Sequence, residues 1–191
     1  YGENSFASFL AGYKNSSKWK ISQFETYIRI DSLLGKPIRI YANKPASDIA
    51  GVEAVSKAMD SAGDIAKIVV HRGHSFHAQK TIKYLTGEER FVGLGSCGGF
   101  SIVNEVLDRS DSAHILSTRG TGTMLVNDPI LLLINAYISK GSDIVWKDVW
   151  NVAGEKLGGN PNFNNYVSPE LNIEVSILRT YREFSKNNPS H

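Results

Sequence analysis

The sequence has little of what would place the protein in a membrane, a disulfide-rich scaffold or a nucleic-acid complex. Its single cysteine, Cys97, excludes a disulfide within the chain, so no oxidising compartment is required. No uninterrupted apolar segment approaches the roughly 20 residues needed to cross a bilayer, and we expect no membrane partner. Lysines and arginines form no long run, and the net charge of +2 argues against nucleic acid as the main partner.

The chain also lacks an initial methionine: it begins at Tyr1, without a signal-like segment. We therefore expect a fragment or a processed form, with further domains of a longer parent chain as partners. With 191 residues, of which 41% are hydrophobic, the sequence is long enough to bury a substantial core. We expect a single domain over residues 1–191, with a peripheral N-terminal segment at 1–23 and a loop and C-terminal helix at 158–191.

Short apolar runs alternate with segments of helical spacing along the chain. Runs of β-branched and apolar residues predict strands, and apolar residues three or four positions apart predict helices. We expect strands at 24–30, 38–41, 65–70, 90–94 and 114–118, and helices at 47–63, 76–85, 102–107, 129–138, 146–157 and from 168 onward. This alternation predicts an α/β protein, a three-layer sandwich with a mainly parallel central sheet flanked by helices.

Two of the expected strands end in reactive side chains. The strand at 65–70 leads into His74, and the strand at 90–94 leads into Cys97. In an open α/β sheet, chemistry gathers outside the carboxyl ends of the strands. If the two strands are neighbours, they bring these side chains to one edge, although they lie 23 positions apart. A cysteine beside an imidazole is the minimum equipment for thiolate catalysis.

Glycine surrounds both reactive side chains. Cys97 lies in the segment Ser96-Cys97-Gly98-Gly99, where a strand is expected to turn into a helix. Backbone N–H groups at such a turn, including those of Cys97 and Gly98, can stabilise a thiolate and an oxyanion on the acyl group under attack. Gly73 can bring its own N–H close to the same carbonyl, and the lack of side-chain bulk leaves room for a bound peptide.

The two motifs together resemble the caspase-like cysteine peptidases, a group that includes caspases, metacaspases, gingipains, clostripain, separase and the CHAT-domain proteases. His71-Arg72-Gly73-His74-Ser75 stands where metacaspases carry Tyr-Ser-Gly-His-Gly. Leu94-Gly95-Ser96-Cys97-Gly98-Gly99 stands where they carry Asp-Ser-Cys-His-Ser-Gly. The similarity continues as in separase and CHAT proteases, with a strand, a small-residue loop, an aspartate and an apolar helix, and it covers about residues 65–138.

The resemblance implies a cysteine endopeptidase that acts on a polypeptide substrate without a cofactor or a metal. Cys97 would attack the scissile carbonyl, His74 would protonate the leaving amine, and the N–H groups of Gly73 and Cys97 would hold the oxyanion. Two departures stand out. Ser75, which is also a candidate for substrate binding, replaces the usual glycine after the histidine, where we expect it to narrow the oxyanion pocket. The 23-residue spacing is shorter than in caspases and suits a compact CHAT-like connection.

Three charged residues are candidates for substrate recognition. In separase-like enzymes an acidic residue in the loop that corresponds to Asp128 helps to receive a basic side chain before the cleaved bond. Asn127-Asp128-Pro129 is equally typical of a helix cap followed by proline in the first turn. Arg72 or Arg119 can instead receive an acidic side chain, as arginines do in caspases. The sequence leaves this choice open.

Other interpretations compete with the peptidase hypothesis. A lone cysteine is often a small buried hydrophobe, and His71 and His77 are candidates for structural histidines. His71, His74 and His77 also read as His-x-x-His-x-x-His, which with Cys97 would make a zinc set.

A second alternative is nucleotide binding. Gly93-Leu94-Gly95-Ser96-Cys97-Gly98 matches the Gly-x-Gly-x-x-Gly fingerprint, and Arg119 after the next strand would favour a phosphate. A third is a catalytically silent caspase-like interaction module, which keeps the fold and lacks the activity.

Overall fold

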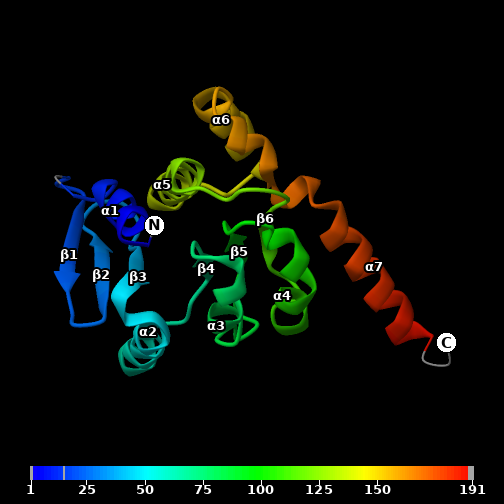
Figure 1. The fold of residues 1–191 in the computed structure, drawn as a ribbon, viewed down its shortest axis with the longest axis horizontal. Coiled ribbons are helices and arrows are strands. Elements are labelled where there is room, and N and C mark those ends of the chain that lie inside the picture. The colour runs from blue at the N-terminus through cyan, green and yellow to red at the C-terminus, as the bar shows by residue number, and fades with distance from the viewer. Residues whose placement is uncertain (1, 15, 189–191) are drawn as a thin grey trace. The chain divides into compact units, whose positions relative to one another are not determined.

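The computed structural model describes residues 2–14 and 16–188, and the chain divides into two compact units, each built from two separate stretches. Unit 1 consists of Tyr1–Ile65 and Met124–Asn160, and unit 2 of Ala66–Thr123 and Pro161–His191. Helices and two β-sheets make up the described part of the chain, so the α/β class predicted from the sequence is confirmed (Figure 1). The single domain over 1–191 stays a prediction.

Unit 1 contains an antiparallel sheet in the order β1 (Trp19–Gln23), β2 (Tyr27–Ser32) and β3 (Arg39–Asn43). The sequence predicts one mainly parallel sheet that includes the second and third of these segments, and the structure differs. The connections between the three strands are short turns, and a parallel pair needs a crossover of a dozen or more residues. Antiparallel pairing in a separate sheet is the result.

The sequence predicts a peripheral segment at residues 1–23, but some of its described side chains belong to the core of unit 1. Helix α1 (Gly2–Ala11) buries Phe9 and Leu10, and Tyr13 follows them into the same cluster. They pack on Ile28 and Ile30 of β2, which are fully buried. Alternate residues of a strand share a face, which explains why these two isoleucines point the same way.

Three further helices complete unit 1: α2 (Asp48–Ala62), α5 (Met124–Lys140) and α6 (Trp146–Leu157). The predicted ends of α2 are correct to within a residue, and Gly63 closes the helix in the left-handed region at φ 67°. Helix α5 begins five residues before Pro129, the residue at which the sequence predicts its start. Close packing joins α1 to α5, because a Cβ on Gly12 would lie 2.9 Å from Cδ1 of Leu132.

Unit 2 contains the parallel strands β4 (Ile68–His71), β5 (Phe91–Leu94) and β6 (His114–Thr118), with the short β7 (Tyr166–Val167) antiparallel beside β6. Between the parallel strands lie α3 (Gln79–Ile82) and α4 (Val103–Arg109), each preceded by a 3-10 turn. These are the βαβ units that the sequence predicts. It does not predict β7, which has only two residues.

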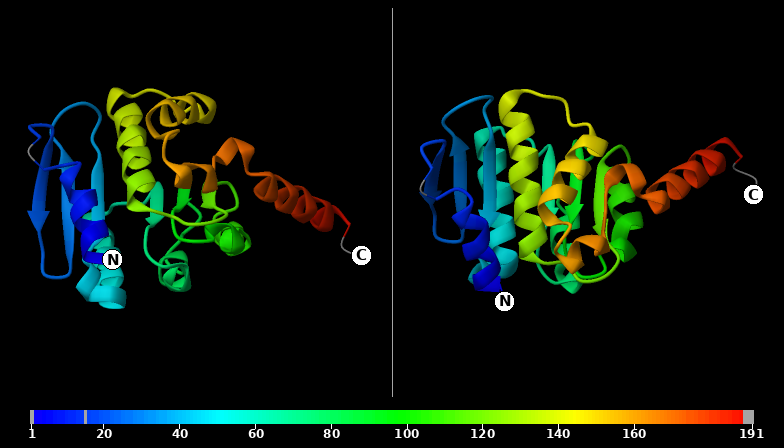
Figure 2. Two further views of the ribbon diagram at one scale, coloured as in Figure 1. Left: turned by 45° about the horizontal axis from the view of Figure 1, so that its top comes forward. Right: turned by 90° about the horizontal axis from the view of Figure 1, so that it is seen from above.

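Helices α3 and α4 lie on one side of the parallel strands, as the left view of Figure 2 shows. The core of unit 2 forms between this face of the sheet and the helices. Its buried members are Ala78, Ile82, Leu85, Val92, Leu94, Val103, Val106, Leu107, Ala113, Ile115 and Val175. Most of these residues lie in the strands and helices that the sequence predicts from apolar spacing.

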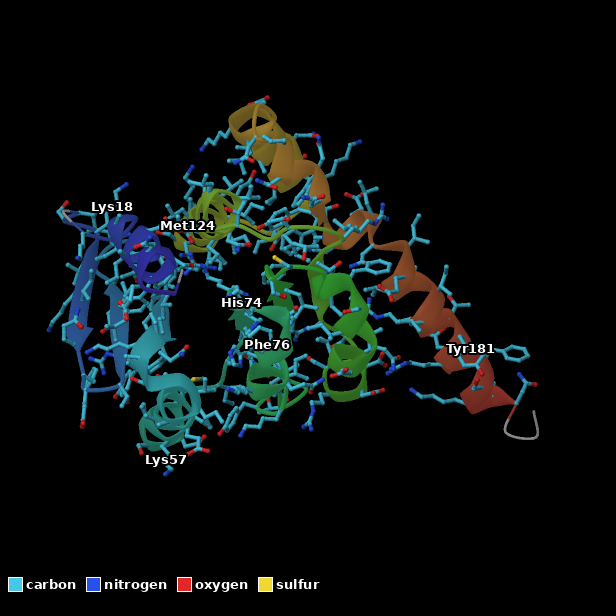
Figure 3. The ribbon with its side chains drawn as sticks, viewed as in Figure 1. Lys18, Lys57, His74, Phe76, Met124 and Tyr181 are labelled. Atoms are coloured by element: carbon cyan, nitrogen blue, oxygen red, sulfur yellow. The ribbon has the colours of Figure 1, made fainter. Side chains whose placement is uncertain are left out.

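The last helix, α7 (Ile173–Asn187), begins later than the sequence predicts. Ser168 and Pro169 open a separate 3-10 turn, in which the Leu171 N–H donates to the Ser168 hydroxyl at 3.4 Å. Val175 of this helix faces the core, whereas Leu171, in the 3-10 turn before it, is exposed. Farther along α7, Tyr181 projects away from the helix (Figure 3). In the described part of the chain, no helix combines the length and the apolar character that crossing a bilayer requires.

Candidate functional site

Strand register in unit 2 brings two loops to the same edge of the sheet. They are the histidine loop, residues 72–75 after β4, and the cysteine loop, residues 95–99 after β5. Strands β4 and β5 are adjacent and parallel, and their last pair is His71 with Leu94. The Gly95 N–H extends the pairing by donating to the His71 carbonyl at 3.0 Å. His74 and Cys97 each lie three residues beyond this last pair, in equivalent positions after neighbouring strands.

Both side chains of the proposed dyad are exposed. Cys97 is therefore not the small buried hydrophobe that a lone cysteine often is. His74 lies on the segment between β4 and α3, next to the labelled Phe76 (Figure 3). A thiol and an imidazole at these positions are both open to a ligand from solvent.

The side chain of Thr118, the last residue of β6, stabilises the cysteine loop. Thr118 is fully buried. The Thr118 hydroxyl accepts a hydrogen bond from the Gly99 N–H at 3.0 Å and donates to the Ser96 carbonyl in a short contact. One hydroxyl thus ties the backbone on both sides of Cys97. The sequence places Thr118 at a strand end, but nothing in its pattern distinguishes it from an ordinary strand residue.

Backbone approaches backbone closely around this loop. A Cβ on Gly99 would lie 2.5 Å from the Leu94 carbonyl oxygen, and one on Gly122 would overlap the carbonyl oxygen of Gly95. Such positions accept only glycine, because a side chain would have to displace backbone atoms. The loop at 119–123 therefore packs directly against the cysteine loop, and the carboxyl ends of β4, β5 and β6 form one continuous edge.

Of the three N–H groups predicted to hold an oxyanion, one already has an acceptor. The Gly98 N–H donates to the Gly120 carbonyl at 2.9 Å, so it is not free for that role in this structure. Within the described residues, the N–H groups of Gly73 and Cys97 donate to no protein acceptor. These two remain the candidates, as the family resemblance implies.

An aromatic ring that sequence reasoning missed lies against the candidate histidine. The rings of His74 and Phe76 are stacked, with centroids 5.2 Å apart and planes 12° from parallel. The His77 ring also contacts Phe76, with the two ring centroids 4.2 Å apart. Phe76 is 72% exposed, although its apolar character places it among the core-facing residues of the predicted helix at 76–85. Hydrophobic spacing alone does not separate it from the buried residues that follow.

The remaining candidates for substrate contact in unit 2 lie on loops near this edge. Arg72 and Ser75 are half-buried in the histidine loop. Arg119 is exposed after β6, with its guanidinium carbon 5.8 Å from the centroid of the Phe100 ring. Its backbone is fixed by a hydrogen bond from its N–H to the Asn165 carbonyl at 2.8 Å. Roles for these three side chains in substrate recognition stay predictions.

Asp128 belongs to unit 1, where it is buried in helix α5. Its carboxylate accepts a hydrogen bond from the Ser8 hydroxyl at 2.6 Å. Because α5 begins at Met124, Asp128 lies inside the helix, and its interpretation as a cap before Pro129 is wrong. A role in receiving a basic substrate side chain stays a prediction.

The geometry argues against the two alternative ligand sites, the zinc site and the nucleotide-binding loop. No group of three or more histidine, cysteine, aspartate or glutamate side chains in residues 2–14 and 16–188 is arranged to hold a metal ion. In the glycine-rich loop at 93–98, the N–H groups of Gly95 and Gly98 already donate to protein carbonyls, which leaves them unable to cradle a phosphate. The helix after that loop, α4, has only seven residues.

Both ring nitrogens of His71 have partners. Nε2 lies 2.9 Å from the His74 carbonyl oxygen, and Nδ1 lies 3.0 Å from the Thr81 hydroxyl. Burial lowers the pKa of His71, which favours the neutral ring. This histidine ends its strand and is enclosed by protein, as its interpretation as a structural residue predicts.

Comparison of the chain with known protein families, with curated proteins and with solved structures gives no match.

Proposed function

We propose that the chain is a cysteine endopeptidase of the caspase-like type, with Cys97 as nucleophile and His74 as general acid and base. The observation that carries this proposal is the register of β4 and β5, which puts the two residues in equivalent positions beyond adjacent parallel strands. The parallel part of the sheet in unit 2 agrees with the mainly parallel, helix-flanked sheet of the proposed fold.

The reaction follows from the atoms at this edge. His74 takes the proton of the Cys97 thiol, and the sulfur attacks the carbonyl carbon of a peptide bond, so that a C–S bond forms as the carbonyl oxygen becomes an oxyanion. The N–H groups of Gly73 and Cys97 donate to that oxygen. When the C–N bond breaks, His74 gives this proton to the leaving amine. It then takes a proton from the water that attacks the thioester, and returns it to the Cys97 sulfur as the C–S bond breaks.

Exposure of the sulfur favours catalysis over a purely structural cysteine, and the hydrogen bonds of Gly95 and Gly98 disfavour nucleotide binding. An interaction module that keeps the fold without activity is the alternative to exclude. A reactivity test separates the two, because an enzyme needs its histidine for the thiol to react with a substrate-like electrophile.

The test uses peptidyl ketone and iodoacetamide labelling, to which a chain with one cysteine gives a single signal. We expect His74→Ala to slow ketone labelling and peptide hydrolysis by about 100-fold or more, the usual contribution of general acid–base catalysis. His77→Ala is the matched control, since it removes another histidine of the same segment, and it should retain most of the rate. Cys97→Ser should abolish both reactions.

Equal labelling rates in the wild type, His74→Ala and His77→Ala would contradict the proposal. Slow labelling that ignores both histidines would favour the interaction module instead.

A further inference from the structure

A buried histidine lies directly under the proposed catalytic loop. His71 ends strand β4 and is 8% exposed, and its ring nitrogens contact the His74 carbonyl and the Thr81 hydroxyl. The proposed reaction uses none of its atoms. A buried imidazole with two fixed partners therefore needs an explanation of its own.

The identity of these partners determines the tautomer of the ring. A carbonyl oxygen only accepts hydrogen bonds, so Nε2 of His71 must carry a hydrogen and donate to the His74 carbonyl. In the neutral ring Nδ1 is then an acceptor, and the Thr81 hydroxyl donates to it. Burial lowers the pKa of His71 and outweighs the opposing effect of the hydrogen bond to the His74 carbonyl, so the neutral form is favoured.

His71 ties both loops of the site to one point of the sheet. Its backbone carbonyl accepts from the Gly95 N–H at 3.0 Å, where the cysteine loop begins. Its ring donates to the His74 carbonyl at 2.9 Å, in the histidine loop. The ring also packs under Gly73, since a Cβ on that glycine would lie 3.3 Å from Cε1 of His71.

We propose that His71 is a positioning residue of the active site, whose Nε2–H fixes the backbone of His74 and Gly73 relative to the cysteine loop. This inference rests on the proposed function, which assigns the proton transfer to His74 and the oxyanion contact to the N–H of Gly73. A shift of about 1 Å in such groups can lower a rate by roughly 100-fold. The loop backbone has to be held for that reason, and α3 supplies the second anchor through Thr81.

Two amide substitutions separate this role from simple core packing. His71→Gln can place an amide N–H where Nε2 lies and keep the donor to the His74 carbonyl, whereas the shorter side chain of His71→Asn has its amide near the position of Nδ1 and does not reach. We expect His71→Asn to lower kcat by about 10- to 100-fold with a much smaller change in KM. We expect His71→Gln to restore kcat to within a few-fold of the wild type. Equal losses in the two variants, with both folded by circular dichroism, would overturn the proposal.

Two NMR measurements do not depend on activity. Long-range ¹H–¹⁵N spectra of the wild type should show a hydrogen on Nε2 of His71 at pH 7, and the Nδ1–H tautomer, which lacks this donor, would overturn the inference. Amide relaxation at residues 72–75 should report greater mobility in His71→Asn than in His71→Gln, and equal mobility would count against positioning. If the wild type proves inactive, the proposed function fails, while these spectra still decide whether His71 holds the loop.

Discussion

Replacing Thr118 by valine tests whether one buried hydroxyl holds the cysteine loop. Valine has nearly the same shape, so the substitution removes the hydroxyl without opening a large cavity. The Gly99 N–H loses its acceptor and the Ser96 carbonyl loses its donor, and both groups face a fully buried side chain. An unsatisfied buried polar group costs about 1–3 kcal/mol, so the two together predict a loss of about 2–6 kcal/mol. That loss is large beside the total stability of about 5–15 kcal/mol of a typical domain.

Urea unfolding followed by circular dichroism measures this loss as a shift of the midpoint at constant slope. Thr118→Ser is the matched control, because it keeps the hydroxyl and gives up one methyl group, at a cost of about 1 kcal/mol. We expect the order wild type, serine, valine from most to least stable. A valine variant as stable as the serine variant would refute the assignment of Thr118 as the support of this loop.

Two further predictions concern backbone geometry and a buried acid in unit 2. Gly99→Ala places Cβ 2.5 Å from the Leu94 carbonyl oxygen and should lower the free energy of unfolding by more than about 2 kcal/mol. Gly98→Ala, with φ at +65° and no atom within 4 Å of its Cβ, should lower it by about 1 kcal/mol. Similar urea midpoints for the two variants would contradict this. The Glu89 side chain is 1% exposed, and this burial opposes its ionisation. Hydrogen bonds from neighbouring N–H and hydroxyl groups outweigh burial and hold the pKa of Glu89 below its ordinary value. Ionised Glu89 therefore stabilises the fold fully above about pH 4.5, and this contribution is lost as the pH falls through the folded-state pKa. Urea midpoints measured from pH 7 to pH 3 should fall less steeply in Glu89→Gln, which should itself be less stable at pH 7 by about 1–3 kcal/mol, and parallel curves would count against this account.

The parts of the fold that the sequence predicts best are those with strong local patterns. The strand at 114–118 and the helix at 146–157 have the bounds that apolar spacing indicates. The helix that ends at Gly63 does so because glycine takes the left-handed conformation at low cost. Each of these signals comes from residues close together in the chain, so no knowledge of distant contacts is required.

The misassigned parts depend on contacts between distant segments. Strand β1 carries polar residues in most positions, and its pairing with β2 is what makes it a strand. Residues 1–23 are expected to be peripheral, because only the packing of Phe9 and Leu10 on Ile28 and Ile30 reveals these two side chains as core. In the site, likewise, Thr118 and Thr81 become important only through the groups they meet after folding.

The sequence by itself determined the candidate residues: the thiol of Cys97 and the imidazole of His74, each in a glycine-containing loop after an apolar strand. Side-chain type and local spacing are written in the chain, and they suffice for that inference. The tertiary structure decided which strands are neighbours, which N–H groups already donate to a carbonyl and which buried side chain contacts the His74 carbonyl. Those properties arise from hydrogen bonds and packing between segments far apart in sequence, and no local pattern encodes them.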